Sequence, residues 1–341
     1  INKGVVLKES ILQRLIQLGC PAVYVEDPLL EGLEIPEPIR EETRQQAQNQ
    51  LRRFFTQVHL GRWVNCSQIK GVVDKLIDEL ASNPRVLVGL TDIRTYDSYT
   101  FGHSVNVCLL SILTGMKMGF NELELRDLAT GALLHDIGKT QINKQVLLKP
   151  GALTEGEYAH VQLHTTFGFE ALRRIPDFSI LVAHIAYQHH ERLEGQGYPR
   201  GLRGDDLHTY ARIVAVADSY DAMTADRIYR PGKEPKAAIQ ELQQMAGRYY
   251  DPQVVEIFCS NVAVYPVGTW VQLNSGYVGV VVDINASTPK RPVVRLLFDP
   301  QGRPMNSLQE VDLSMERELG ITSTLSEVER ETWQTYAVRR R

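Results

Sequence analysis

Residues 128–139, with the sequence LATGALLHDIGK, are the point from which we interpret the rest of this chain. An apolar run of helical character leads directly into His135 and Asp136. An ionised carboxylate on a buried helix is unfavourable without partners, and a divalent metal binds imidazole nitrogen and carboxylate oxygen together. Lys139 follows His135 by four residues and shares its helix face if the helix continues that far. These residues alone leave open a metal site and a buried, hydrogen-bonded His–Asp pair.

Histidines are concentrated in one part of the chain. Seven of the nine lie between His103 and His190. His103, His164 and the adjacent pair His189-His190 each fall in a predicted helix or at its end, and Asp218 follows an apolar helical run. Helices of a bundle can direct side chains from distant positions to one interior site. So many histidines and aspartates with apolar flanks exceed what a core ordinarily holds, and the pattern favours a metal cluster.

Apolar periodicity predicts an almost wholly helical region from residue 98 to residue 262. The predicted helices cover residues 105–118, 123–134, 155–174, 180–190, 211–225, 235–245 and 252–261. A longer helical pattern precedes them at residues 40–81, with a break expected near Gly61-Arg62-Trp63. Short loops join these segments, which is typical of a helical bundle.

The two ends of the chain differ from this helical region. Near the N-terminus we expect a helix over residues 12–16 capped by Ser10, and then a short strand at residues 23–25. Near the C-terminus, β-rich segments at residues 267–273, 278–282 and 293–297 predict a small barrel or sandwich. The expected units are a small N-terminal α/β unit (1–38), a helical connector (39–97), the main helical domain (98–262), a β-rich domain (263–322) and a polar tail (323–341).

Composition excludes several classes of protein. Charged residues make up 23% and hydrophobic residues 43%, which is compatible with a sizeable core and not with global disorder. The net charge of −4 provides no global attraction to a nucleic-acid polymer or an anionic membrane. We expect no membrane segment, because no apolar stretch approaches about 20 residues. The four cysteines are scattered without a CxxC pair, so we expect reduced thiols and a cytoplasmic protein.

Several ordered motifs give the helical region a specific resemblance to a known family. They are Tyr99-Thr100 with His103-Ser104, His135-Asp136-Ile137-Gly138-Lys139, Lys149-Pro150-Gly151 with Leu153-Thr154, His164 with Gly168, His189-His190-Glu191, Gly197-Tyr198-Pro199 with Gly201-Leu202, and Arg212-Ile213 through Ala217-Asp218, Asp221-Ala222 and Arg227. From about Tyr99 to Phe258 the chain resembles the HD-GYP subgroup of the HD-domain metal-dependent phosphohydrolases. The expected fold is accordingly mainly α, an HD-type helical bundle with a small N-terminal α/β unit and a small C-terminal β-barrel-like unit.

The resemblance implies hydrolysis of cyclic di-GMP, a bacterial second messenger, at a centre of two or three metals. The ligands it implies are His103, His135, Asp136, His164, His189, His190 and Asp218, with Asp136 bridging two metals. The implied metal is iron or manganese, and histidine and carboxylate ligands suit both. Tyr99 stands where a three-metal subset of the family has Glu, so we expect a binuclear centre rather than a third metal.

Other residues are candidates for catalysis and substrate binding. Lys139 is expected to hold the phosphate or the nucleophile, and Asp221 to orient the attacking water or accept its proton. Arg227 and Arg230 carry guanidinium groups suited to phosphate, with ordinary solvated arginines as the alternative. The glycine-rich loop 195–204 is interpreted as a lip for substrate or partner, against a plain surface turn. Its candidate residues are Gly197, Tyr198, Pro199, Arg200 and Arg203.

Three functions are compatible with this pattern. A cyclic di-GMP phosphodiesterase that releases linear pGpG, GMP or both is the leading hypothesis. A non-catalytic receptor for the cyclic dinucleotide, or a module that binds a partner, is the second, although a pure binder does not need seven metal-ligand residues. A hydrolase of a different cyclic dinucleotide is the third, because metals contact phosphate rather than base. A homodimer and a signalling partner at the Gly197-Tyr198-Pro199 loop are left open.

Overall fold

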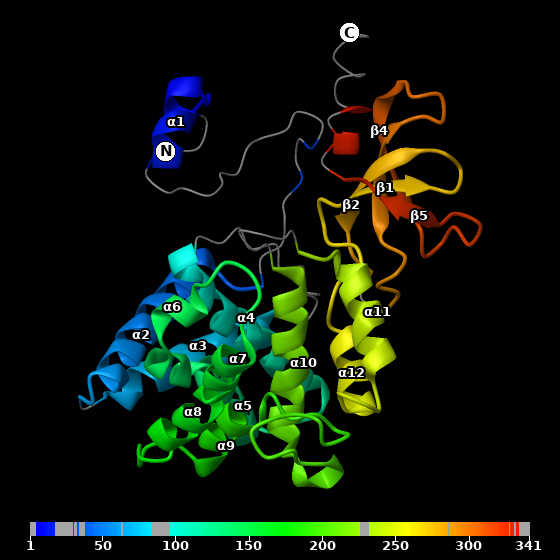
Figure 1. The fold of residues 1–341 in the computed structure, drawn as a ribbon. Coiled ribbons are helices and arrows are strands. Elements are labelled where there is room, and N and C mark those ends of the chain that lie inside the picture. The colour runs from blue at the N-terminus through cyan, green and yellow to red at the C-terminus, as the bar shows by residue number, and fades with distance from the viewer. Residues whose placement is uncertain are drawn as a thin grey trace.

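The computed structural model describes residues 5–17, 30, 33, 38–62, 64–83, 96–225, 232–285, 287–326, 328–330 and 332–333. Its helices are α1 (Glu9–Gln17), α2 (Glu41–His59), α3 (Cys66–Ser82), α4 (Tyr96–Lys117), α5 (Glu122–Leu134), η2 (Ile137–Gln141), α6 (Lys144–Leu147), α7 (Glu155–Gln162), α8 (His164–Leu172), α9 (Ile180–Gln188), η3 (Gly204–Asp206), α10 (Thr209–Thr224), α11 (Pro235–Met245) and α12 (Pro252–Cys259). Helices α2 to α10 form a bundle, and a small sheet lies beyond α11 and α12 (Figure 1).

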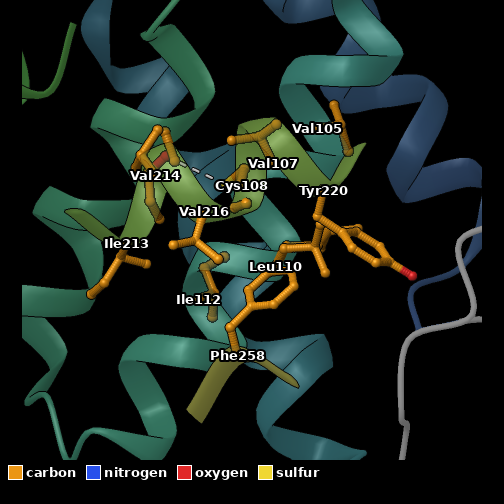
Figure 2. Close-up of a cluster of buried hydrophobic side chains, with 14 of the residues drawn as sticks. Val105, Val107, Cys108, Leu110, Ile112, Ile213, Val214, Val216, Tyr220 and Phe258 are labelled. Atoms are coloured by element: carbon orange, nitrogen blue, oxygen red, sulfur yellow. Dashed lines mark hydrogen bonds between the residues drawn. The ribbon is translucent and has the colours of Figure 1, made fainter. Parts of the chain in front are cut away.

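Helix α4 forms the centre of the bundle. It contacts α2, α3, α5, α10 and α12. Its residues from Val105 to Ile112 are buried, as is typical of a helix enclosed on all faces. Figure 2 shows this core, where side chains of α4 meet Val214 and Val216 of α10 and Phe258 of α12. The mainly helical architecture expected from the sequence is therefore confirmed.

Most predicted helices are present, with small shifts at their ends. The break near Gly61 separates α2 from α3, and the single helix predicted over residues 155–174 is divided into α7 and α8. Thr154 begins α7 with a capping box, because its side chain accepts a hydrogen bond from the Glu157 N–H and the Glu157 carboxylate accepts one from the Thr154 N–H. Local capping therefore fixes the orientation of a segment that leads into His164.

One local prediction was wrong, and the condition attached to another is not met. Ser10 lies inside α1 rather than capping it, because the helix already begins at Glu9. The helix before His135 ends at Leu134, and a tighter 3-10 helix begins at Ile137. The four-residue spacing of His135 and Lys139 therefore does not place them on one α-helical face. The strand predicted at residues 23–25 lies outside the described residues.

The C-terminal unit is an antiparallel sheet of five strands. The strands are β1 (Trp270–Leu273), β2 (Val278–Asp283), β3 (Val293–Phe298), β4 (Pro304–Asp312) and β5 (Ile321–Thr324), in the order β4-β3-β2-β1-β5. The expected small β unit is thus confirmed, although β4 and β5 were not predicted. Val271, Val281 and Val294 belong to the same apolar core as the helices, so sheet and bundle share one hydrophobic interior.

Two smaller expectations concern membranes and thiols. Among the described residues, no helix combines the length and the apolarity that crossing a bilayer requires. Cys66, Cys108 and Cys259 are free thiols, and the first two are buried. Cys20 lies outside the described residues.

Candidate metal centre

Five parts of the bundle bring the predicted ligand residues to one place. His103 lies on α4, His135 and Asp136 lie in the turn after α5, His164 begins α8, His189 and His190 follow α9, and Asp218 lies on α10. Residues separated by more than a hundred positions in sequence therefore meet inside the bundle. Four of them, His135, Asp136, His164 and His189, are at most 1% exposed.

Asp136 is the residue that most of the others face. Its Oδ2 atom lies 3.4 Å from Nε2 of His135 and 3.8 Å from Nε2 of His103. Its Oδ1 atom lies 3.6 Å from Nε2 of His164 and 3.9 Å from Nε2 of His189. Each carboxylate oxygen is thus directed at a different pair of imidazoles, the arrangement expected of a carboxylate between two cation positions.

Asp218 connects the remaining histidine to the cluster. Its Oδ1 atom lies 3.2 Å from Nε2 of His103, and its Oδ2 atom lies 4.0 Å from Nδ1 of His190. Two groups of donor atoms, each within 4.8 Å of one another, could hold a metal ion. The groups are His103, His135 and Asp136, and His164, His189 and His190.

Backbone carbonyls fix the orientation of three of these imidazoles. In each case Nδ1 donates a hydrogen bond to the carbonyl oxygen three residues earlier, at 2.6 to 3.0 Å. The pairs are His135 with Ala132, His164 with Val161, and His189 with Ala186. With the proton held on Nδ1, the lone pair of Nε2 points into the cluster, as a metal ligand requires.

Two buried polar atoms at the centre of the cluster have no hydrogen-bond partner among the described residues. They are Nε2 of His135 and Oδ1 of Asp136. Leaving a buried acceptor unsatisfied costs about 1–3 kcal/mol, so native proteins rarely tolerate it without a ligand. An imidazole nitrogen and a carboxylate oxygen are both ligand atoms that divalent cations bind, so the residues present fit a metal centre.

Burial and charge set the protonation of this cluster for metal binding. Burial lowers the pKa of His164 to about 4 and that of His190 to about 3. Burial, together with neighbouring histidines, also holds the pKa of His189 well below its ordinary value. Burial raises the pKa of Asp136, but Lys139 and the nearby histidines outweigh it, and the net pKa is well below the usual range. His164, His189 and His190 are therefore neutral imidazoles, beside the charged carboxylate of Asp136.

Asp221 lies behind His103 rather than facing the other ligands. Its Oδ2 atom is 2.7 Å from Nδ1 of His103, and its Oδ1 atom accepts a hydrogen bond from Asn106. Burial lowers the pKa of His103, but hydrogen bonds to Asp218 and Asp221 outweigh it and raise the pKa to about 9. Metal binding at Nε2 would therefore displace a proton.

Lys139 reaches the cluster from the 3-10 turn. Its Nζ atom is 2.5 Å from Oδ2 of Asp136, and about a third of the side chain is exposed. The early end of α5 accounts for this contact, since η2 places Lys139 over Asp136 instead of beside His135. Lys139 thus lies between the buried cluster and solvent.

The loop that contains Gly197-Tyr198-Pro199 covers one side of the cluster. The Tyr198 ring lies 4.8 Å from the His190 ring and 6.4 Å from the His164 ring, measured between centroids. Gly197 allows this approach, because a Cβ atom there would meet the Cα atom of Glu191 at 2.3 Å. Arg200 and Arg203 have exposed side chains. Tyr198 therefore adjoins the predicted ligands, whereas these two arginines lie at the surface.

The remaining candidates lie where nothing can be said of their side chains. Arg227 and Arg230 fall within residues 226–231, outside the described residues, and the side chain of Tyr99 is also outside them. Their predicted roles stay predictions.

Sequence reasoning missed a residue that holds the loop in place. Glu191 is 1% exposed, and its two carboxylate oxygens accept hydrogen bonds from the backbone N–H groups of Arg200 and Leu202, at 2.7 and 3.0 Å. The motif His189-His190-Glu191 contains this residue, but the pattern predicted no role for it. An acidic residue next to two buried histidines and before a glycine-rich loop was the available signal.

Comparison with known families agrees with this geometry. A model of the HD domain matches residues 75–254, and a model of a KOW domain associated with HD domain matches residues 270–332. The first match includes all the predicted metal ligands, and the second covers the C-terminal sheet. HD domains bind divalent metals, which agrees with the two donor groups.

Curated relatives of this chain are named as phosphodiesterases of cyclic dinucleotides. A cyclic di-GMP phosphodiesterase of Pseudomonas aeruginosa is 35% identical over 260 residues, which is 76% of this chain and 63% of the relative. A cyclic di-GMP phosphodiesterase of Thermotoga maritima is 42% identical over 163 residues, 48% of this chain and 44% of the relative. A 3'3'-cGAMP-specific phosphodiesterase of Vibrio cholerae is 36% identical over 155 residues, 46% of this chain and 34% of the relative. The chain thus spans less than two thirds of each relative.

A solved structure supports the same fold. Bd1817, a HDG"Y"P protein from Bdellovibrio bacteriovorus, superposes with a TM-score of 0.54 at 24% identity, covering 73% of this chain and 77% of that chain. At this identity the likeness concerns the fold alone. The match of the HD-domain model to more than half of the chain assigns the family. The chain belongs to the HD-domain family, and its resemblance to the HD-GYP proteins is confirmed.

Proposed function

We propose that this chain is a metal-dependent phosphodiesterase that hydrolyses cyclic di-GMP to linear pGpG, GMP or both. The observation that carries the proposal is the convergence of imidazoles around Asp136, whose Oδ1 atom is buried without a hydrogen-bond partner. The relatives named as cyclic di-GMP phosphodiesterases support the choice of substrate. So many buried ionisable groups around one carboxylate also argue against a purely structural role.

The proposed metal ligands are the seven residues named from the sequence: His103, His135, Asp136, His164, His189, His190 and Asp218. We propose a binuclear centre of iron or manganese with Asp136 shared between the two positions, since its two oxygens face different imidazole pairs. Bound divalent ions of this type supply Lewis acidity toward a phosphodiester and make water a better nucleophile at neutral pH.

Residues outside the ligand set would bind and orient the substrate. The ammonium group of Lys139 is partly exposed beside Asp136, where it can hold a phosphate oxygen at the mouth of the cluster. Tyr198 forms an aromatic wall next to His190 that can limit water access and support a base. Gly197, Pro199, Arg200 and Arg203 are proposed to shape this lip, and Arg227 and Arg230 to contact phosphate.

Asp221 is better described as a positioning residue than as the proton acceptor we expected. Both of its carboxylate oxygens have protein partners, His103 and Asn106. A carboxylate that accepts the Nδ1 proton of a metal-binding histidine fixes its tautomer and raises its basicity. We therefore propose that Asp221 acts on the reaction through His103.

The organisation of the chain is proposed on the same basis. The helical region from residue 98 to residue 262 would be catalytic, with the segment 39–97 as connector, the segment 263–322 as a β-rich accessory domain and the segments 1–38 and 323–341 as its ends. A cytoplasmic location, a homodimer and a signalling partner at the Gly197-Tyr198-Pro199 loop remain predictions.

The decisive test is turnover by the metal-loaded protein. Protein reduced and loaded with Fe²⁺ or Mn²⁺ is incubated with cyclic di-GMP, and the products are separated by chromatography. We expect linear pGpG or GMP, and loss of both metal and activity in His135→Ala and Asp136→Ala. His160→Ala, a histidine outside the ligand set, should behave as wild type. Absence of turnover of both cyclic di-GMP and a mixed cyclic dinucleotide, with metal bound, would refute the phosphodiesterase and leave the receptor.

A mixed cyclic dinucleotide is the second candidate substrate. The relative from Vibrio cholerae named as specific for 3'3'-cGAMP is 36% identical over 155 residues, close to the 35% of the Pseudomonas aeruginosa relative. Because bound metals would contact phosphate rather than base, the ligand set does not select the base. Parallel incubation with cyclic GMP-AMP, compared by kcat/KM, distinguishes the two substrates.

A further inference from the structure

A chain of buried hydrogen bonds runs from helix α2 to the metal centre. The Arg44 guanidinium donates from Nη1 to Oδ1 of Asn106 at 2.8 Å. The Asn106 side chain donates from Nδ2 to Oδ1 of Asp221 at 2.9 Å, and Oδ2 of Asp221 lies 2.7 Å from Nδ1 of His103. His103 in turn places Nε2 within 3.2 Å of Asp218. Four consecutive side chains therefore link α2 to a proposed metal ligand.

All members of this chain are shielded from water. Arg44 is 8% exposed, Asn106 0%, Asp221 2% and His103 4%. Water therefore cannot readily replace a missing partner, and the low local dielectric strengthens each bond. Arginine is also the cation most suited to a buried position, since its guanidinium stays charged.

The donor and acceptor properties of the four side chains allow only one orientation for each hydrogen bond between Arg44 and His103. A guanidinium can only donate, so it requires the carbonyl oxygen of the Asn106 amide. The amide then has to present its NH₂ group to Asp221, whose carboxylate can only accept. With that carboxylate oriented, the proton of His103 is held on Nδ1, which leaves the Nε2 lone pair for a metal. Arg44 thus fixes which way the amide of Asn106 faces.

Arg44, where this chain of hydrogen bonds begins, lies outside the matched HD domain. That match begins at residue 75, whereas α2 ends at His59. Helix α2 contacts both α4, which carries His103, and η2, which carries Lys139. A second arginine, Arg40, binds Glu79 of α3 instead, at the surface.

From these contacts we propose that Arg44 is a positioning residue of the metal centre, acting on His103 through Asn106 and Asp221. This inference rests on the proposed role of His103 as a metal ligand. Helix α2 is then part of the catalytic unit rather than a plain connector, and a displacement of α2 would change metal binding at His103.

Metal affinity tests the inference without relying on turnover. The full chain is stripped of metal and titrated with Co²⁺ against a chromophoric chelator, and the visible absorption spectrum of the Co²⁺ form is recorded. Loss of an outer-shell partner typically weakens metal affinity by about 10–100-fold. We expect Arg44→Met to weaken Co²⁺ binding by about 10-fold and to alter the spectrum, and Arg44→Lys, which keeps a donor, to recover most of the affinity.

Matched variants separate the hydrogen-bond chain from the docking of the helix. Arg40→Met loosens the attachment of α2 to α3 without touching Asn106, and should bind Co²⁺ as wild type does. Asn106→Leu should weaken binding about 10-fold, and adding Arg44→Met to it should cause little further loss, because both changes interrupt the same chain.

The outcomes distinguish this inference from the proposed function. If His103→Ala binds Co²⁺ with wild-type affinity and spectrum, the proposed ligand set fails. If His103→Ala weakens binding but Arg44→Met equals Arg40→Met, the inference about Arg44 alone is overturned. Should Arg44→Met not fold, wild-type affinity and spectrum in Asn106→Leu would overturn it instead.

Discussion

Gly138 is the position where adding one methyl group should most directly damage the metal centre. It lies between Asp136 and Lys139, where the 3-10 turn packs against the start of α8. A Cβ atom at this residue would lie 1.9 Å from the carbonyl oxygen of His164 and 2.6 Å from the backbone nitrogen of Gly168. Both obstacles are backbone atoms, so no side chain can rotate to relieve the contact.

The required displacement follows from these distances. An ordinary contact needs 3.4 Å, so turn and helix must separate by about 1.5 Å (3.4 − 1.9). The turn carries Asp136 and the helix carries His164, whose Nε2 is now 3.6 Å from Oδ1 of Asp136. Metal sites tolerate changes of about 0.2 Å in ligand distance, so Gly138→Ala should reduce metal affinity by at least about 100-fold. Overpacking should also cost about 3 kcal/mol in free energy of unfolding.

Metal content and urea unfolding check this prediction. Bound metal is measured by mass spectrometry after gel filtration, and stability from the unfolding midpoint. The control is Gly156→Ala in α7, where no atom lies within 4 Å of the new methyl group. It should keep its metal and gain up to about 1 kcal/mol from helix propensity. Wild-type metal content and stability in Gly138→Ala would show that our account of the packing is mistaken.

Three further substitutions probe the rim of the site. Glu191→Ala should remove two hydrogen bonds from the Arg200 and Leu202 N–H groups to a charged acceptor, at a cost of about 1–3 kcal/mol that urea unfolding should show. KM should also rise, and an unchanged KM would exclude the loop from substrate binding. Lys139→Met should keep the metal but lower kcat/KM by about 100-fold. Steady-state kinetics and metal analysis check this prediction, and loss of metal would instead make Lys139 a structural partner of Asp136. Arg227→Ala should mainly raise KM, and a variant with unchanged KM would exclude Arg227 from the substrate site.

The sequence was sufficient for most of the helical architecture. Helix α11 was predicted with its observed ends, because Pro235 marks its first turn and apolar residues recur at helical spacing up to Met245. The predicted ligands also lie together, because buried His and Asp side chains on apolar helices are stable only where they share polar or metal partners. The helix ends follow from local periodicity, whereas the meeting of the ligands follows from their shared need for buried polar partners.

Features that depend on tertiary contacts could not be predicted in this way. The helix over residues 123–134 was predicted with its observed end at Leu134, but the 3-10 turn that follows was not, because that turn depends on packing against α8. Strand β4 was missed because its sequence, PMNSLQEVD, shows no regular apolar alternation, and pairing with β3 gives it a regular structure. The bond between Arg44 and Asn106 joins residues 62 positions apart, so no spacing rule could indicate it.

Two helices end at the metal centre, α5 at Leu134 and α9 at Gln188. The carboxyl end of a helix carries about half a negative charge from its aligned peptide dipoles. Together with the carboxylates of Asp136, Asp218 and Asp221, these ends outweigh the positive charges of Lys139 and of protonated His103, so the metal-free site has a negative potential. The proposed substrate is an anion, so the site repels it until cations are bound. Binding should therefore be ordered, with metal first and dinucleotide second. Calorimetric titration of dinucleotide into protein stripped of metal by a chelator should accordingly give little heat.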